Sequence, residues 1–217
     1  MKRLVLIAAI CSIVASPVLA DGTAYLDGWM YNLGGSPGWN GTTEEGWSGS
    51  FTVITNGLGI PMDGTRYETF CVEKWVNVYV PGTYTAVINT GAIYGNVGGF
   101  DPLDPKTAWL FDQYLSGNAF GYADKSLRAR DVQWAIWSIE QEWALGADAK
   151  YDGAKALVAL SAGKWNDIGN IRVLNLWNGT DRTTDVQDLL VKVPIPAAVL
   201  LGLLGLGAAG VKLRKHA

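Results

Sequence analysis

The sequence predicts an α+β domain that is rich in β-strands, with a sandwich or barrel-like sheet and two or three helices. Short segments in which apolar side chains alternate with a period of two residues lie toward both ends of the central region. Longer segments with the apolar spacing of helices lie between them. The chain's 27 glycines and ten tryptophans are typical of a β-rich domain with many turns and aromatic packing.

The first strand predictions fall before residue 90. Residues 50–55 form one candidate strand among glycine-rich loops. Residues 66–80 alternate apolar and polar positions as an extended chain would, and Pro81-Gly82 then predicts a turn. A second strand over residues 84–88 would pair with the first, so we expect a β-hairpin here.

Three helices are expected in the middle of the chain, over residues 106–115, 126–143 and 151–160. The first follows Asp101-Pro-Leu-Asp-Pro105, a turn in which an aspartate would cap the helix by accepting main-chain hydrogen bonds. In the second, Gln133 and Trp137 lie four residues apart and therefore on one side of the helix. Two closing strands, over Ile171–Trp177 and residues 186–193, complete a single domain.

The two ends of the chain differ from the body over residues 21–193. Residues 1–20 have a charged start, an apolar stretch and a small-residue cleavage site, as a secretory signal peptide does. Residues 194–217 combine an apolar helix over 196–211 with a basic tail over 212–217. At the usual helical rise this helix is about 24 Å long, somewhat short for a hydrocarbon core of about 30 Å. The basic tail residues, which stay cytoplasmic by the positive-inside tendency, are Lys212, Arg214 and Lys215.

Charge and composition exclude several functions for the body. It holds all 20 acidic residues and 12 of the 17 basic ones, a net charge of −8, which disfavours nucleic acid as a partner. The single histidine, His216, lies in the basic tail. The body therefore has no Ser-His-Asp triad, no Cys-His dyad and no histidine metal ligand, and we expect no enzyme, metal site or cofactor.

The C-terminal segment carries a recognisable motif. Val193, Pro194, Ile195, Pro196 and Ala197, followed by a Leu/Gly-rich helix and a short basic tail, resemble the PEP-CTERM class of bacterial sorting signals in its VPLPA variant. Ile195 replaces the glutamate that the parent motif has between its prolines. The resemblance implies transient anchoring in the inner membrane, cleavage by an exosortase-like membrane protease, and release or attachment at the surface of a cell that makes exopolysaccharide and biofilm. An ordinary C-terminal membrane anchor explains the helix and charges equally well.

Cys71 is the only cysteine of the body, because Cys11 lies in the signal peptide. An intramolecular disulfide is therefore impossible in the exported chain. On the predicted strand, the face of Cys71 also carries Tyr67, Trp75 and Tyr79, so we expect the thiol to be shielded from water. A thiolate can attack a glutamine carbonyl, release ammonia and leave a thioester, provided that the fold aligns the groups and excludes water. Trp75, Trp134 and Trp137 would be suitable walls.

Two segments resemble the thioester domain of bacterial surface adhesins. Phe70-Cys71-Val72-Glu73 is followed, 62 positions after the cysteine, by Val132-Gln133-Trp134-Ala135-Ile136-Trp137. The resemblance implies that Cys71 and Gln133 form the thioester and that Phe70, Val132, Ala135 and Trp137 complete the motif. Val132 stands where that family usually has threonine. The family implies covalent capture of an amine or hydroxyl nucleophile on a surface or matrix, exopolysaccharide included.

Three alternatives remain open from the sequence. Cys71 is equally compatible with a small buried apolar residue, with Gln133 simply hydrogen-bonded beside Trp137. The tryptophans also fit a non-covalent carbohydrate or matrix-binding module, in which indole rings stack on sugars. Glu73 and Glu140 would be the carboxylate pair of a glycosidase if they lay at the required separation.

Overall fold

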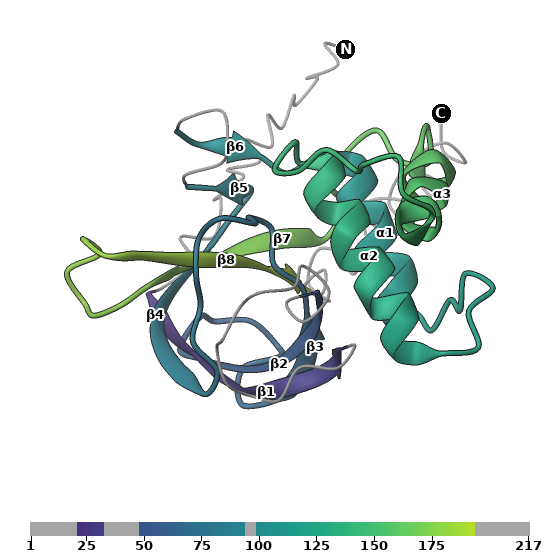
Figure 1. Ribbon diagram of the computed structural model, residues 1–217. Coiled ribbons are helices and arrows are strands. Elements are labelled where there is room, and N and C mark those ends of the chain that lie inside the picture. Colours follow the sequence, from purple (N-terminus) through teal and green to yellow (C-terminus); the bar gives the residue numbers. More distant parts are fainter. Residues whose placement is uncertain (1–20, 33–47, 94–98, 194–217) are drawn as a thin grey trace, which may run out of the picture.

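The computed structural model describes residues 21–32, 48–93 and 99–193 (Figure 1). The signal peptide, the sorting motif from Pro194 onward, the C-terminal helix and the basic tail lie outside these residues. Within the described ranges, no helix combines the length and the apolar character needed to cross a membrane.

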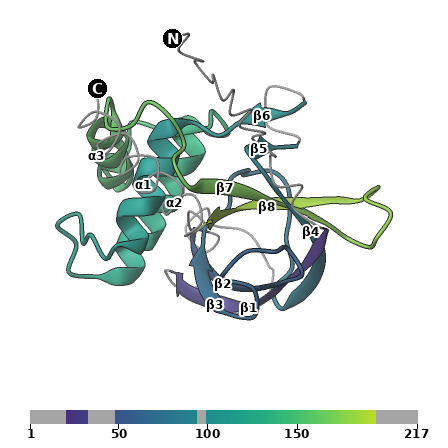
Figure 2. The same ribbon diagram turned by 180° about the vertical axis from the view of Figure 1, so that it is seen from behind.

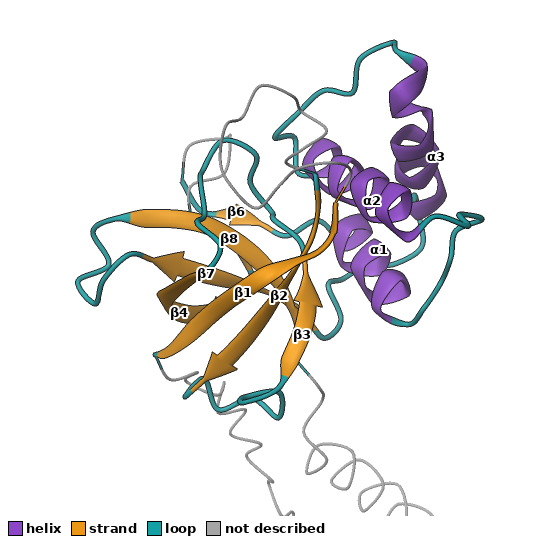
Figure 3. Ribbon diagram, turned by 60° about the horizontal axis from the view of Figure 1, so that its bottom comes forward, coloured by secondary structure: helices purple, strands orange, loops and turns teal. Residues whose placement is uncertain are grey.

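Six strands form one antiparallel sheet with the order β3-β2-β1-β4-β7-β8. The sheet curls into a half-barrel rather than two stacked layers, so the sandwich alternative was wrong (Figures 1 and 3). A small two-stranded ribbon joins β5 and β6. The strands are β1 (Gly22–Asn32), β2 (Gly49–Asn56), β3 (Arg66–Thr69), β4 (Gly82–Asn89), β5 (Gly91–Ala92), β6 (Asp101–Pro102), β7 (Ile171–Trp177) and β8 (Asp185–Lys192).

The helices gather on one side of the sheet, and the view from behind shows the same grouping (Figures 1 and 2). They are α1 (Pro105–Leu115), α2 (Lys125–Ile139) and α3 (Asp152–Ser161), with a short 3₁₀ turn, η1 (Ala149–Tyr151), before α3. Asp104 caps α1 as predicted, because its side chain accepts a hydrogen bond from the Lys106 N–H. Helix α2 packs against β1 and β2 and contacts both other helices.

The two edges of the half-barrel meet at one place. The pairing of β3 with β2 ends at Thr69, and residues 70–72 then cross to β8. Cys71 lies opposite Leu189, the Leu190 N–H donates to the Phe70 carbonyl at 3.0 Å, and the Val72 N–H donates to the Asp188 carbonyl at 2.9 Å. We call this pairing of residues 70–72 with β8 the seam.

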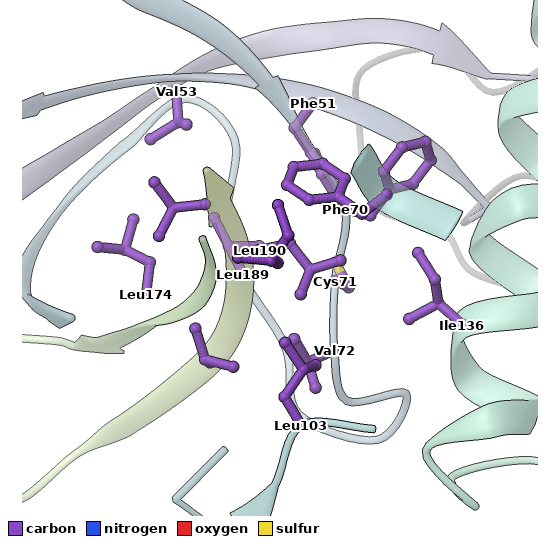
Figure 4. Close-up of a cluster of buried hydrophobic side chains, with 14 of the residues drawn as sticks. Phe51, Val53, Phe70, Cys71, Val72, Leu103, Ile136, Leu174, Leu189 and Leu190 are labelled. Carbon is purple, nitrogen blue, oxygen red and sulfur yellow. The ribbon is translucent and has the colours of Figure 1, made fainter. Parts of the chain in front are cut away.

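The hydrophobic core reaches the seam from both sides. Cys71 lies between Leu189 of β8 and Ile136 of α2, with Phe70 and Val72 beside it (Figure 4). The largest fully buried side chains are Trp134, Phe51, Phe70, Phe111, Leu26, Leu58, Leu110, Ile136, Ile171, Leu174, Leu176 and Leu189. The seam is thus a central part of the fold.

Two element predictions were wrong. The hairpin does not form, because β4 pairs with β1 and β7, whereas residues 73–81 are irregular. Helix α2 ends at Ile139, four residues before the predicted end. Its end is set by Gln141, whose φ of 63° is left-handed, and the Trp143 N–H turns back to the Trp137 carbonyl at 3.1 Å.

Candidate functional site

The seam gives the main chain of Cys71 an unusual orientation. The hydrogen bonds to β8 come from the residues on either side of Cys71, so Cys71 and Leu189 form a non-hydrogen-bonded pair of the antiparallel ladder. In such a pair, the N–H and C=O groups point away from the partner strand. Those of Cys71 therefore need partners on the other side, where the pairing with β2 has already ended.

Gln133 supplies both partners from the middle of α2. Its Oε1 accepts a hydrogen bond from the Cys71 N–H at 2.9 Å, and its Nε2 donates to the Cys71 carbonyl at 2.8 Å. The side chain is completely buried, so no water competes for these groups. The side-chain amide thus takes the place of a neighbouring strand and is fixed in position and orientation beside Cys71.

The thiol of Cys71 is free and buried, with 1% of the residue exposed, as the strand pattern predicted. Burial, and then the nearby charge of Glu73, raise the pKa of the thiol well above its ordinary value. The group is therefore a thiol and not a thiolate at neutral pH. Any chemistry that needs the thiolate needs a proton acceptor close by.

A buried acidic network adjoins the seam. The Glu73 carboxylate accepts a hydrogen bond from the Asp188 N–H at 2.9 Å. The Asp188 carboxylate in turn accepts from Asn175 Nδ2 at 2.7 Å, from the Leu176 N–H at 3.1 Å and from the Ile93 N–H at 3.0 Å. Burial and then the charge of Glu73 raise the pKa of Asp188 well above its usual range.

The motif neighbours all lie in the core around the pair. Phe70, Val132, Ala135 and Trp137 are each at most 4% exposed. The Phe70 ring meets Tyr114 of α1 edge to face, with ring centroids 4.8 Å apart. Trp137 Nε1 donates to the Glu73 carbonyl at 2.9 Å and thereby ties α2 to the chain just after the seam.

The expected aromatic walls are only partly present. Trp134 and Trp137 are buried, and each has an edge-to-face contact with Trp143. Trp75 was wrongly expected to shield the thiol, because the chain leaves the extended conformation after the seam and this residue is 69% exposed. Its indole N–H donates to the Glu142 carbonyl at 3.2 Å, and the Lys74 ammonium lies 4.4 Å from the centre of its ring.

The remaining predicted residues are not brought to this site. Glu140 accepts from the Asp104 N–H at the junction of α1 and α2, whereas Glu73 accepts at the seam, so the two glutamates belong to separate networks. Val193 ends the described part of the chain, with its N–H on the Asn170 carbonyl at 2.8 Å. In residues 21–32, 48–93 and 99–193, no group of three His, Cys, Asp or Glu side chains is placed to hold a metal ion.

Asp188, Asn175 and Gln187 were not identified from the sequence. Gln187 Nε2 donates to the Glu73 carbonyl, beside the indole of Trp137. One signal was available, since Asp188 is an acid immediately before Leu-Leu-Val in a strand whose other central positions are apolar or buried. A buried acid at such a position needs polar partners, which Asn175 and main-chain N–H groups provide.

No protein-family model matches the chain, and no curated protein matches it in sequence. Among solved structures, the chain is similar to the N-terminal thioester domain of fibronectin-binding protein SfbI from Streptococcus pyogenes. This similarity has a TM-score of 0.45 and 13% sequence identity, and it covers 84% of this chain and 97% of that chain. It is a likeness in overall shape to a bacterial N-terminal thioester domain.

Proposed function

We propose that this chain is an exported surface protein that forms an internal thioester between Cys71 and Gln133 and uses it for covalent adhesion. One observation carries the proposal. The Gln133 amide is held by two hydrogen bonds to the main chain of the same residue that carries the thiol, in a site closed to water. Such fixed alignment can replace a large part of the entropic cost of bringing two reactants together.

The contacts also fit the electronic needs of the reaction. When sulfur attacks the amide carbon, negative charge develops on Gln133 Oε1, to which the Cys71 N–H already donates at 2.9 Å. The thiol proton goes to the amide nitrogen, the C–N bond breaks and one ammonia leaves. The thioester then joins the seam to α2.

Adhesion would follow when a nucleophile reaches the acyl carbon. A target amine forms an amide with the Gln133 side chain, the C–S bond breaks, and the Cys71 sulfur regains a proton. A target hydroxyl would give an ester in the same way. The chain is consumed in this step, so the proposed activity is a single covalent capture and not enzymatic turnover.

The two ends of the chain support a route to the cell surface. The signal peptide over residues 1–20 would direct export, and the motif over residues 193–197 would be read by an exosortase-like protease of the inner membrane. Changing Pro194 and Pro196 together to alanine should leave the basic tail on the mature protein. A tail that is retained equally in the unchanged protein would favour a permanent anchor instead.

Intact mass measurement of the purified chain tests the thioester directly. The unchanged protein should be lighter by one ammonia, and methylamine should add to it while a free thiol appears. Cys71→Ala and Gln133→Ala should each have the mass of the unmodified variant, whereas Gln113→Ala, which changes a glutamine on α1, should still lose ammonia. An unchanged protein that has its full mass and gains nothing from methylamine would refute the proposal.

A second candidate function is non-covalent binding of a carbohydrate or matrix polymer. It is favoured by two aromatic side chains on the loop after the seam, Trp75 and Tyr79, which are 69% and 64% exposed. Such rings can stack on sugars. Trp75→Ala and Tyr79→Ala should then weaken retention on immobilised polysaccharide, while Cys71→Ala binds normally; the covalent proposal expects the reverse.

A further inference from the structure

We infer that Glu73 is the proton carrier of thioester formation: its carboxylate takes the proton from the Cys71 thiol and delivers it to the departing nitrogen of Gln133. This inference rests on the proposed function. It adds a residue that neither the spacing of cysteine and glutamine nor their contacts identify. The reasons are the position of Glu73, the need for a proton acceptor and the charge of the acidic network.

The position follows from the seam. In a regular ladder, the Asp188 N–H would donate to the Val72 carbonyl, because these two residues form a hydrogen-bonded pair. The chain bends at Val72, and the Glu73 carboxylate accepts that hydrogen bond instead, at 2.9 Å. The carboxylate therefore lies at the end of the seam, next to the Cys71–Leu189 pair, and Glu73 is only 1% exposed. Its charge is close enough to act on the thiol.

Main-chain contacts hold Glu73 firmly in this place. Trp137 Nε1 and Gln187 Nε2 both donate to its carbonyl oxygen. Trp137 lies one turn after Gln133 on α2, so the same helix positions the amide and the proposed proton carrier. This gives the indole of Trp137 a role in aligning the reaction.

The need for an acceptor follows from burial. The thiol holds its proton at neutral pH, and the body of the chain has no histidine. The nearest cation in sequence, Lys74, has its ammonium 3.6 Å from the centre of the Trp143 ring and carries no basic lone pair when charged. Among described residues that adjoin the seam, the acceptors of suitable chemistry are the two carboxylates.

The two carboxylates are not equivalent. Asp188 takes hydrogen bonds from the Asn175 side chain and from two main-chain N–H groups, and these contacts direct it toward β7 and β5. Glu73 lies on the chain that carries Cys71, two residues away. Asp188 thus serves to raise the proton affinity of its neighbour by repulsion, while Glu73 meets the thiol.

The proposed step balances without a co-reactant. The S–H proton moves to Glu73 as the C–S bond forms, and Gln133 Oε1 carries the negative charge against the Cys71 N–H. Glu73 then gives the proton to Gln133 nitrogen, the C–N bond breaks and ammonia departs. Glu73 ends as the carboxylate it was at the start, so it acts as a carrier.

The test follows maturation in full chains made by cell-free synthesis in mild detergent. Translation is stopped, samples are denatured with an alkylating agent at intervals, and intact mass gives the fraction that has lost ammonia. Glu73→Gln keeps an acceptor for the Asp188 N–H but cannot carry the proton. We expect maturation to slow by about 100-fold, within the usual range for general acid–base catalysis. Glu142→Gln, which changes another buried glutamate that contacts the same loop, is the matched control and should mature normally.

The outcomes separate this inference from the proposed function. If unchanged chains never lose ammonia, both fail. If unchanged chains and Glu73→Gln mature at the same rate, the thioester stands and the role of Glu73 is refuted. Should Glu73→Gln not fold, the pH profile of the unchanged chain decides. A carboxylate carrier predicts a rate that rises through the acidic range and levels off by neutral pH, whereas a rate still rising tenfold per pH unit above pH 8 overturns it.

Discussion

Gln133 illustrates how one side chain can satisfy the main chain at the edge of a sheet. A buried main-chain N–H or C=O without a partner costs free energy, and Cys71 presents both groups toward α2. The primary amide of glutamine has one donor and one acceptor in the spacing of a peptide group. The same chemistry that completes the sheet therefore also holds an amide carbon beside a thiol.

Trp137 provides a stability test of the contacts around this residue. Trp137→Phe removes the indole N–H that donates to the buried Glu73 carbonyl, and it leaves a smaller ring in the core. We expect the free energy of unfolding to fall by about 2 kcal/mol, the sum of a hydrogen bond and lost packing. Urea unfolding measures the change.

The matched control uses another tryptophan that makes the same type of bond. Trp75 also donates its indole N–H to a carbonyl, that of Glu142, but is 69% exposed. Trp75→Phe should change stability by less than about 0.5 kcal/mol, because water can replace the lost partner. Equal effects of the two substitutions would contradict the importance assigned to the Trp137 contact.

At the residue scale, the sequence identified the central pair and missed its acidic neighbours. Cys71 was singled out as the body's only cysteine, and Gln133 by its spacing from Trp137 on a helix. Asp188 and Asn175 come together only through the register of β7 with β8, which a bulge shifts between Leu174 and Leu176. Such a register cannot be read from alternation alone.

At the scale of elements, Glu140 makes the junction of α1 and α2 sensitive to pH. Burial is the main cause that raises its pKa to about 8, from an ordinary value near 4.5. The folded state therefore keeps a proton that the unfolded chain loses as pH rises from about 4.5 to 8. Over that window, this residue lowers stability by up to about 1.4 kcal/mol per pH unit.

Glu140→Gln should remove this pH dependence. The amide can still accept the Asp104 N–H and never ionises. We expect the variant and the unchanged protein to unfold at the same urea concentration near pH 4.5, and the variant to be the more stable by several kcal/mol at pH 8. A stability difference that is the same at both pH values would show that Glu140 ionises normally in the folded protein.

The packing of α3 on α2 depends on a glycine. A Cβ atom on Gly153 would overlap the carboxylate of Asp131 and the hydroxyl of Tyr122, which are hydrogen-bonded to each other at 2.7 Å. Glycine to alanine normally stabilises a helix by about 0.5–1 kcal/mol. Here we expect Gly153→Ala to destabilise by about 1–3 kcal/mol, because the helices must separate. Thermal unfolding by circular dichroism gives the sign, and a higher melting temperature would contradict the close approach.

Elements with one clear period were predicted well, and those with interrupted patterns were not. Ile171–Trp177 was predicted to the residue, and α1 and α3 to within one residue at each end. Strand β1 was missed, since its glycines and two register irregularities break the alternation. The hairpin failed for a related reason: β1, which the sequence did not reveal, takes the place beside β4.

At the scale of the whole molecule, the seam and α2 connect distant parts of the chain. Residues 70–72 join the two edges of the half-barrel, and Gln133 joins this seam to the helical side. The proposed thioester would turn that hydrogen-bonded junction into a covalent one between positions 62 residues apart. A cross-link of this length chiefly restricts the unfolded chain.

Cleavage of the thioester should therefore lower stability without changing the fold. For a closed loop of this size, the chain-entropy relation gives about 4 kcal/mol, which corresponds to roughly 10 °C in melting temperature for a domain of this length. Methylamine treatment opens the loop while every other side chain is kept, so unchanged protein should melt about 10 °C lower after treatment. Cys71→Ala, which has no thioester to open, should melt at the same temperature before and after treatment. An equal shift in both proteins would mean that methylamine acts elsewhere, and no shift in the unchanged protein would mean that Cys71 and Gln133 are held together by hydrogen bonds alone.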